Sequence, residues 1–177
     1  MDMRETIGEK RYAHTERVEE MAVRLASRHG VDVEKARIAA HYHDCMKIKD
    51  RDLLFQKAEE LGLSLTDELK RSPELIHAPL GALAAEKFYG VTDEEILTAI
   101  AEHTTGSATM SSLSKVLYLA DMVEEGRTFP GVEKIREAAF RDLDEAMRLG
   151  LSHTLRFLLD KSLPIALDSV RCYNALV

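Results

Sequence analysis

Apolar residues recur at the three- and four-residue spacing of α-helices along most of this chain, and no stretch alternates like a strand over a useful length. The helical segments stop at residues such as Gly30, Gly62 and Gly90, as glycine commonly ends helices. Thr92, with Glu95 three residues later, predicts a capping box at one helix start. The pattern predicts helices over 7–29, 33–47, 51–61, 78–89, 93–103, 112–125, 132–140 and 142–161, followed by a short tail.

These segments predict one all-α domain over residues 1–177, a helical bundle of about seven to nine helices. No repeat, low-complexity tract or change of composition marks a second domain. We expect residues 11–125 to carry the core of the functional site. Residues 131–177 are then expected to complete the bundle and the pocket.

Charge and composition restrict the partners of the chain. With 24 basic and 31 acidic residues, the net charge is −7, which argues against a general nucleic-acid or anionic-membrane binder. No stretch approaches the ~18–20 apolar residues of a membrane span, and the charged N-terminus lacks the apolar run of a signal peptide. Cys45 and Cys172 form no C-x-x-C pair, so neither a disulfide framework nor a thiolate zinc site is expected. We expect a cytoplasmic protein.

Two histidines stand where apolar residues are expected on helices. His14 begins a stripe that continues at i+4, i+7 and i+11, and His43 extends the face that carries Ala36 and Ala40. Asp44 follows His43 near a helix C-terminus, where the helix dipole disfavours a carboxylate unless a cation offsets it. Each residue alone also fits an ordinary role: a core histidine bonded to a carbonyl, or an exposed aspartate at a fraying end.

Three further residues repeat this pattern. His103 follows Ile96 and Ile100 on one helix face, and Asp121 lies among apolar neighbours in the next helix. A buried aspartate needs a cation, backbone donors or a metal, and a salt bridge is the simpler alternative. His77 begins a helix, where it also fits a capping role.

Together the six residues predict a site for two metal ions. Four imidazoles and two carboxylates without thiolate suit iron, manganese or zinc better than magnesium. Two metals about 3.5–4 Å apart commonly hydrolyse phosphate esters and anhydrides, because they generate hydroxide at neutral pH and stabilise the attacking and leaving oxygens. The predicted ligands are His14, His43, Asp44, His77, His103 and Asp121.

The order H…HD…H…H…D on a helical chain resembles the HD-domain phosphohydrolases. It is most similar to the YqeK-type family, the bacterial symmetrical hydrolases of diadenosine tetraphosphate. The matching stretches are RYAHT (11–15), HDCMK (43–47), SPELIHAPLGA (72–82), HTTG (103–106), LYLADMVEEGRTFPGV (117–132) and PIALDSVRCYN (164–174). The resemblance implies a single HD-domain bundle with a di-iron centre, which cleaves the substrate between its two central phosphates into two ADP by attack of metal-bound hydroxide.

The resemblance also implies roles for individual residues. His14, His43, Asp44 and Asp121 would hold one iron, and His77 and His103 would hold the other with Asp44 bridging. Asp44, Lys47 and Arg127 are the implied catalytic residues. The implied substrate-binding residues are Lys47, Thr104, Thr105, Arg127, Asp168, Tyr173 and Asn174. For Lys47 and Arg127, the residues alone favour solvated surface charge.

Some alternatives stay open at this stage. The same ligand set suits an HD phosphohydrolase acting on another nucleotide or a cyclic dinucleotide, and a nucleotide-sensing module without turnover is a third possibility. We expect a homodimer only because symmetric dimers are the commonest oligomers. His41 lies about 200° from His43 around the helix, so we expect it outside the site, and we expect Cys45 to be a small buried residue.

Overall fold

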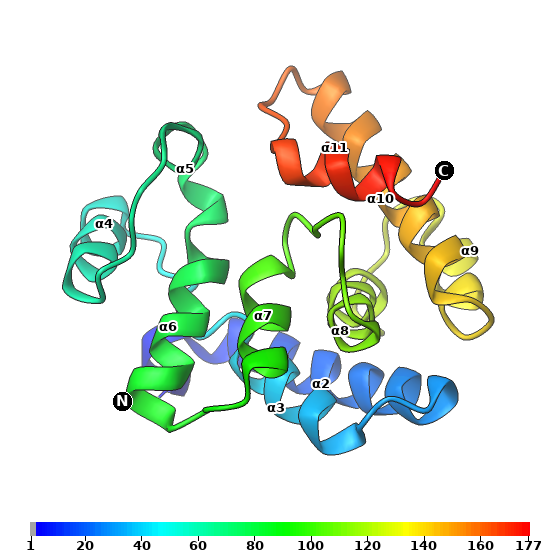
Figure 1. Cartoon of the computed structure of the whole chain (residues 1–177), viewed down its shortest axis with the longest axis horizontal. Helices are drawn as coiled ribbons and strands as arrows, with labels where there is room; N and C mark the ends of the chain where they lie inside the picture. The colour runs from blue at the N-terminus through cyan, green and yellow to red at the C-terminus, as the bar shows by residue number, and fades with distance from the viewer. Residues whose placement is uncertain (1–2) are drawn as a thin grey trace.

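A computed structural model describes residues 3–177 of the chain. Within that range it contains eleven α-helices, one short 3-10 helix and no strand (Figure 1). Nine of the helices have eight residues or more, so the predicted all-α bundle is confirmed. The elements are α1 (Met3–Ile7), α2 (Glu9–His29), α3 (Val33–Tyr42), α4 (Arg51–Glu60), α5 (Asp67–Arg71), η1 (Pro73–Leu75), α6 (His77–Tyr89), α7 (Glu94–Glu102), α8 (Ser112–Val123), α9 (Val132–Ala139), α10 (Leu143–Asp160) and α11 (Leu167–Asn174).

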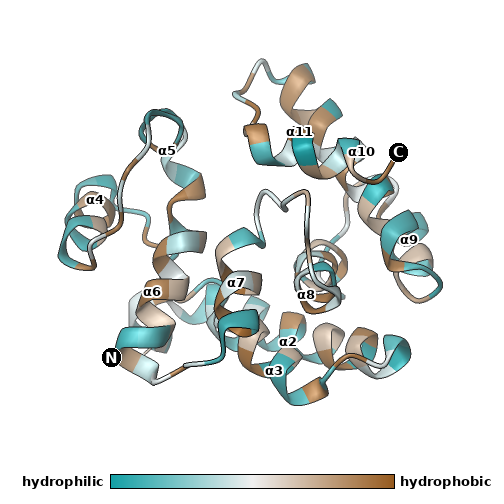
Figure 2. Ribbon diagram, in the orientation of Figure 1, coloured by the Kyte–Doolittle hydropathy of each residue, from teal (hydrophilic) through white to brown (hydrophobic). Residues whose placement is uncertain are grey.

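Helix α8 lies at the centre of the bundle and packs against α2, α3, α7, α9 and α10 (Figure 1). Leu113, Leu117 and Leu119 on α8 are each exposed by 1% or less. A smaller apolar cluster, which includes Leu54 and Leu80, lies beneath α4 and α6. Apolar and polar positions share the same helices in Figure 2, as amphipathic helices require. The buried side of α8 therefore gives the functional residues a rigid support.

The ends of the predicted helices lie within two residues of the prediction except at the end of α3, and the cap of α7 also differs. Asp93, and not Thr92, caps α7, because its carboxylate accepts hydrogen bonds from the backbone N–H groups of Glu95 and Ile96. The helix expected over 33–47 ends at Tyr42, and residues 43–46 form a turn instead. The ring nitrogen Nδ1 of His43 lies 2.6 Å from the carbonyl oxygen of Ala40. The imidazole thus pairs with one of the carbonyl groups that the end of a helix leaves without a backbone partner.

Two short helices form where a loop and a tail were expected. In α5, the hydroxyl of Thr66 accepts a hydrogen bond from the backbone N–H of Leu69. Helix α11 begins after Ala166, which offers no capping side chain, and Glu68 accepts from the backbone N–H of Leu167 at 2.8 Å. This hydrogen bond connects α11 to α5, which precedes α6 in the chain. No helix between residues 3 and 177 is both long and apolar enough to cross a membrane.

Replacing Leu117 with alanine should lower the free energy of unfolding by about 2–5 kcal/mol, because the side chain is completely buried at the centre of the bundle. Leu159→Ala is the matched control, since this leucine of α10 is 65% exposed and should change stability by less than about 0.5 kcal/mol. Urea unfolding of both chelator-treated variants measures the difference. Equal losses in the two variants would contradict the central place of α8.

Candidate metal centre

Six predicted ligands converge from five parts of the fold. His14 lies on α2, His43 and Asp44 form the turn after α3, and His77 begins α6. His103 directly follows α7, and Asp121 lies on α8. The four histidine side chains and Asp44 are each exposed by 8% or less, while Asp121 is 24% exposed. The centre is therefore buried on most sides and open near Asp121.

The carboxylate of Asp44 lies in the middle of the cluster. Its Oδ1 is 3.2 Å from Nε2 of His77 and 3.7 Å from Nε2 of His103, and its Oδ2 is 3.6 Å from Nε2 of His43. Nε2 of His14 lies 3.0 Å from Oδ1 of Asp121. Asp44 thus faces three imidazoles at once, which is the position that a bridging ligand needs.

In each of the four histidines, Nδ1 lies within hydrogen-bonding distance of an acceptor outside the cluster. Nδ1 of His43 lies 2.6 Å from the Ala40 carbonyl, that of His77 2.6 Å from the Glu74 carbonyl, and that of His103 2.7 Å from the Ile100 carbonyl. Nδ1 of His14 lies 3.1 Å from a Glu124 oxygen. When each Nδ1–H donates outward, each Nε2 lone pair points into the cluster, as metal ligation requires.

The donor atoms fit metal ions. The buried Nε2 atom of His43 has no hydrogen-bond partner among the described residues, although such atoms usually have one. Nε2 of His77 lies 3.2 Å from Nε2 of His103, so two ring nitrogens face each other. Two groups of ligand atoms each lie within 4.8 Å of one another: His14, His43 and Asp121, and His43, Asp44 and His103. The structure thus brings all six residues together, and how they divide between two ions stays a prediction.

Burial sets the charge of these groups. It lowers the pKa of His43, and it lowers the pKa of His77 to about 4, so both rings are neutral and able to donate a lone pair at pH 7. Burial also opposes ionisation of Asp44, but His43, His103 and His77 outweigh it and hold its pKa well below the usual range. A negative Asp44 among neutral imidazoles is the charge arrangement that a cation would stabilise.

Three cationic side chains contact the cluster. Arg11 donates from Nη1 to Asp44 Oδ2 at 2.9 Å, which the sequence did not predict. Arg127 reaches Asp121 Oδ1 with Nη2 at 2.5 Å, and Nζ of Lys47 lies 2.9 Å from Nε2 of His77. Burial lowers the pKa of Lys47. The sequence signal for Arg11 is its place one helical turn before His14, on the same face of α2.

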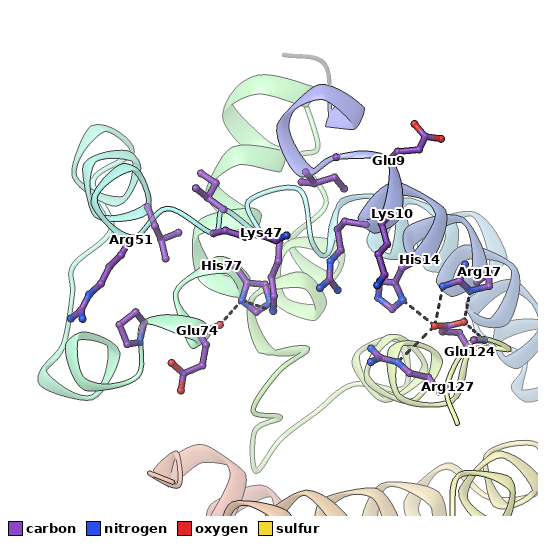
Figure 3. A pocket seen from close by; sticks show the side chains of 18 residues that line it. Glu9, Lys10, His14, Arg17, Lys47, Arg51, Glu74, His77, Glu124 and Arg127 are labelled. Carbon is purple, nitrogen blue, oxygen red and sulfur yellow. Dashed lines mark hydrogen bonds and ion pairs between the residues drawn. The ribbon is translucent and has the colours of Figure 1, made fainter. Parts of the chain in front are cut away.

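Glu124 is a buried carboxylate behind His14 that sequence reasoning also missed. It is 2% exposed and lies three residues after Asp121, at the end of α8. Besides facing His14, it accepts a hydrogen bond from Nε of Arg17 at 2.6 Å (Figure 3). His14 is thus oriented by a carboxylate, whereas the other three histidines are oriented by backbone carbonyls. A carboxylate partner raises the basicity of a ligating imidazole.

Two cavities reach the cluster. The larger, of about 820 Å³, touches His14 and His77, and Figure 3 shows Lys10, Lys47 and Arg127 around these two histidines. The smaller, of about 220 Å³, touches His103 and Asp121 and is also lined by Arg127. Arg127 is therefore common to both.

The predicted substrate-binding residues take different places. Thr104 lines the smaller cavity, and the hydroxyl of Thr105 donates to the Gly106 carbonyl at 3.1 Å. Asp168, Tyr173 and Asn174 lie on α11 and line neither of these two cavities. Their contact with substrate stays a prediction.

Two expectations about neighbouring residues are confirmed. Nδ1 of His41 lies 2.6 Å from a Glu19 oxygen, away from the cluster. Cys45 is completely buried, and burial raises the pKa of its thiol to about 12, so it is an inert packing residue.

His43→Ala should remove most of the bound metal, because it deletes a nitrogen that belongs to both groups of ligand atoms. His41→Ala is the control two residues earlier and should retain the wild-type metal content, since His41 pairs with Glu19. Elemental analysis of the metal per chain after iron loading under reducing conditions measures both. Equal metal contents in the two variants would show that these nitrogens hold no ion.

Glu124→Gln should weaken metal binding by about 10–100-fold, the usual effect of changing the partner of a ligating histidine. The adjacent Glu125→Gln is the control, because Glu125 is 58% exposed and pairs with Arg24. Competition against a chelator of known affinity gives the change. An unaltered affinity in Glu124→Gln would mean that this carboxylate does not act through His14.

Comparison with known proteins agrees with this geometry. The HD domain family matches residues 11–164. A protein of Halalkalibacterium halodurans named bis(5'-nucleosyl)-tetraphosphatase, symmetrical, is 44% identical over 97% of this chain and 91% of its own length. A Bacillus subtilis protein of the same name is 40% identical over 99% of this chain and 94% of its own length.

A solved structure shows the same fold. The crystal structure of a predicted HD superfamily hydrolase involved in NAD metabolism, from Clostridium acetobutylicum, superposes with a TM-score of 0.94 at 39% identity, and covers 98% of this chain and 92% of its own. The family match spans most of the chain, and these relatives span almost all of it. The resemblance drawn from the sequence is confirmed, and this protein belongs to the HD domain family.

Proposed function

We propose that this protein is a metal-dependent hydrolase that cleaves diadenosine tetraphosphate symmetrically into two molecules of ADP. The observation that carries the proposal is the shared position of Asp44, whose two oxygens face His43, His77 and His103 inside a cluster of six ligand residues. The names of the Halalkalibacterium and Bacillus relatives support the substrate, because those proteins align with this chain almost end to end.

The proposed cofactor is a pair of metal ions, iron first, with manganese or zinc as alternatives of similar ligand preference. His14, His43, Asp44 and Asp121 would hold one ion, and His77 and His103 would hold the other with Asp44 shared. Once bound, such ions polarise phosphoryl oxygens and make water nucleophilic at neutral pH.

Two cationic side chains, Lys47 and Arg127, would then position the substrate. Lys47 is 34% exposed and Arg127 38% exposed, whereas Asp44 is 3% exposed, so the cluster opens toward these two cations. The fork of Arg127 suits two oxygens of a phosphate, and the ammonium of Lys47 adds a point charge beside His77. Both cations would stabilise the negative charge that develops as the anhydride breaks. In the structure Arg127 contacts Asp121 and Lys47 contacts His77, so substrate binding would exchange these contacts for phosphate oxygens.

Symmetrical cleavage fits the two cavities. Each touches two of the six ligands, and Arg127 lines both. A phosphate chain centred on the cluster would extend one nucleotide half into each cavity, which leaves the central anhydride at the ligands. Thr154 of α10 lines the smaller cavity, which supports the view that residues 1–177 act as one unit in which residues 131–177 complete the pocket of the 11–125 core.

We also propose a cytoplasmic location, because both Cys45 and Cys172 are free and buried, as suits a reducing compartment. A homodimer is proposed on the general frequency of symmetric dimers alone.

Arg127→Ala should lower kcat/KM for diadenosine tetraphosphate by about a hundredfold or more, because it removes a charge aimed at the reacting phosphates. Arg141→Ala is the control, since Arg141 lies on the surface and pairs with Glu145. Anaerobic turnover of the iron-loaded protein, with products separated by chromatography, should give ADP alone. AMP plus ATP would contradict symmetrical cleavage. Preference for a cyclic dinucleotide or a mononucleotide would contradict the substrate, and binding without turnover would indicate a sensing module.

A further inference from the structure

The larger cavity is a groove that extends well beyond the ligand cluster. It runs from the start of α2 to the segment 47–51 before α4, and its volume of about 820 Å³ lies in the range of complete small-molecule sites. Only part of this space is next to His14 and His77. The remainder has no role in holding metal, so it is free to bind the distal part of a ligand.

Positive charge dominates the groove in a chain whose net charge is −7. Seven lysine and arginine side chains line it against three glutamates. Four of the cations (Arg11, Arg17, Lys47 and Arg127) already contact acidic or imidazole groups of the centre. The other three (Lys10, Lys49 and Arg51) form no ion pair with any residue between 3 and 177. We call these three the outer cations.

The outer cations come from both walls of the groove. Lys10 belongs to the first turn of α2, whereas Lys49 and Arg51 precede and begin α4. The guanidinium of Arg51 lies 5.3 Å above the ring of Phe55, which restricts where it can go. Charges on two facing walls of a low-dielectric groove reinforce each other and attract anions.

The smaller cavity has the opposite character. Tyr118, Met122 and Phe129 line it with two rings and a thioether. Apart from the imidazoles of His14 and His77 at the centre itself, no aromatic ring lines the groove. Rings and sulfur suit the flat face of a nucleobase, whereas unpaired ammonium and guanidinium groups suit phosphate oxygens.

We propose that the two halves of the symmetric substrate are bound unequally: the smaller cavity holds one nucleoside by its ring, and the groove holds the other half by its phosphates through the outer cations. The inference rests on the proposed function. It assigns to Lys10, Lys49 and Arg51 the selection of ligands whose distal half is strongly anionic, with little reading of the distal base.

The test is the double charge reversal Lys49→Glu with Arg51→Glu. KM for diadenosine tetraphosphate should rise about tenfold or more while kcat stays within about twofold, because two exposed attractive contacts become repulsive. Added salt should raise KM less steeply than in the wild type, since screening weakens only the remaining attraction. Lys10→Glu, on the opposite wall, should shift KM in the same direction.

The control reverses one lysine and one arginine elsewhere: Lys134→Glu with Arg148→Glu, both exposed on α9 and α10. This control should keep the wild-type KM, and all variants should keep the wild-type metal content. A rise in KM as large in the control as in Lys49→Glu/Arg51→Glu would show a general effect of net charge and overturn the proposal.

Calorimetric titration with ADP separates this inference from the proposed function. The metal-loaded wild type should bind two ADP per chain and the double variant one. If the wild type hydrolyses diadenosine tetraphosphate but the double variant keeps its KM and both ADP sites, the groove proposal is wrong and the function stands. If the wild type shows no turnover but the double variant loses one ADP site, the function is wrong, and what stands is the binding of an anionic nucleotide in the groove.

Discussion

A carboxylate that is 3% exposed, such as that of Asp44, is stable only where cations or polarised N–H groups surround it. Here Arg11 donates to it, and the Nε2 atoms of His43, His77 and His103 face it, so that a cation held between them would complete its surroundings. Because Asp44 adjoins His43 in a tight turn, α3 must end at Tyr42 for both side chains to reach the cluster. The early end of α3, the start of α6 and the end of α7 each bring a histidine to this one charge.

The sequence predicted the all-α bundle and directed six candidate ligand residues inward, and both predictions had a physical basis. Polar residues such as His14 and Asp121 continue apolar stripes, so helical spacing alone directs them inward. The residues that cap the helices were harder to predict. Thr92 and Asp93 both suit the start of a helix, and only the backbone geometry selects Asp93. Helix α11 was missed since its first residues carry no capping side chain of their own and rely on Glu68, far away in the sequence.

The cationic residues around the site were the least predictable. Lys10, Lys49 and Arg51 look like ordinary surface charges in a sequence, because no pattern of neighbouring residues distinguishes one exposed cation from another. Their significance depends on which segments the fold brings together: the start of α2 with the approach to α4, and the end of α8 with α2. Glu124 was hidden for the same reason, since its partners Arg17 and His14 lie on another helix.

The ligands come from positions spread between 14 and 121, so an ion bound by them would join distant parts of the chain as a cross-link does. Such a link would hold the ends of α3 and α7, the start of α6, the first half of α2 and the last turn of α8 against local opening. The metal-free chain would keep these segments together mainly by packing, and proteases act on segments that open. The metal supply of a cell would then determine how long such a chain lasts, as well as whether it works.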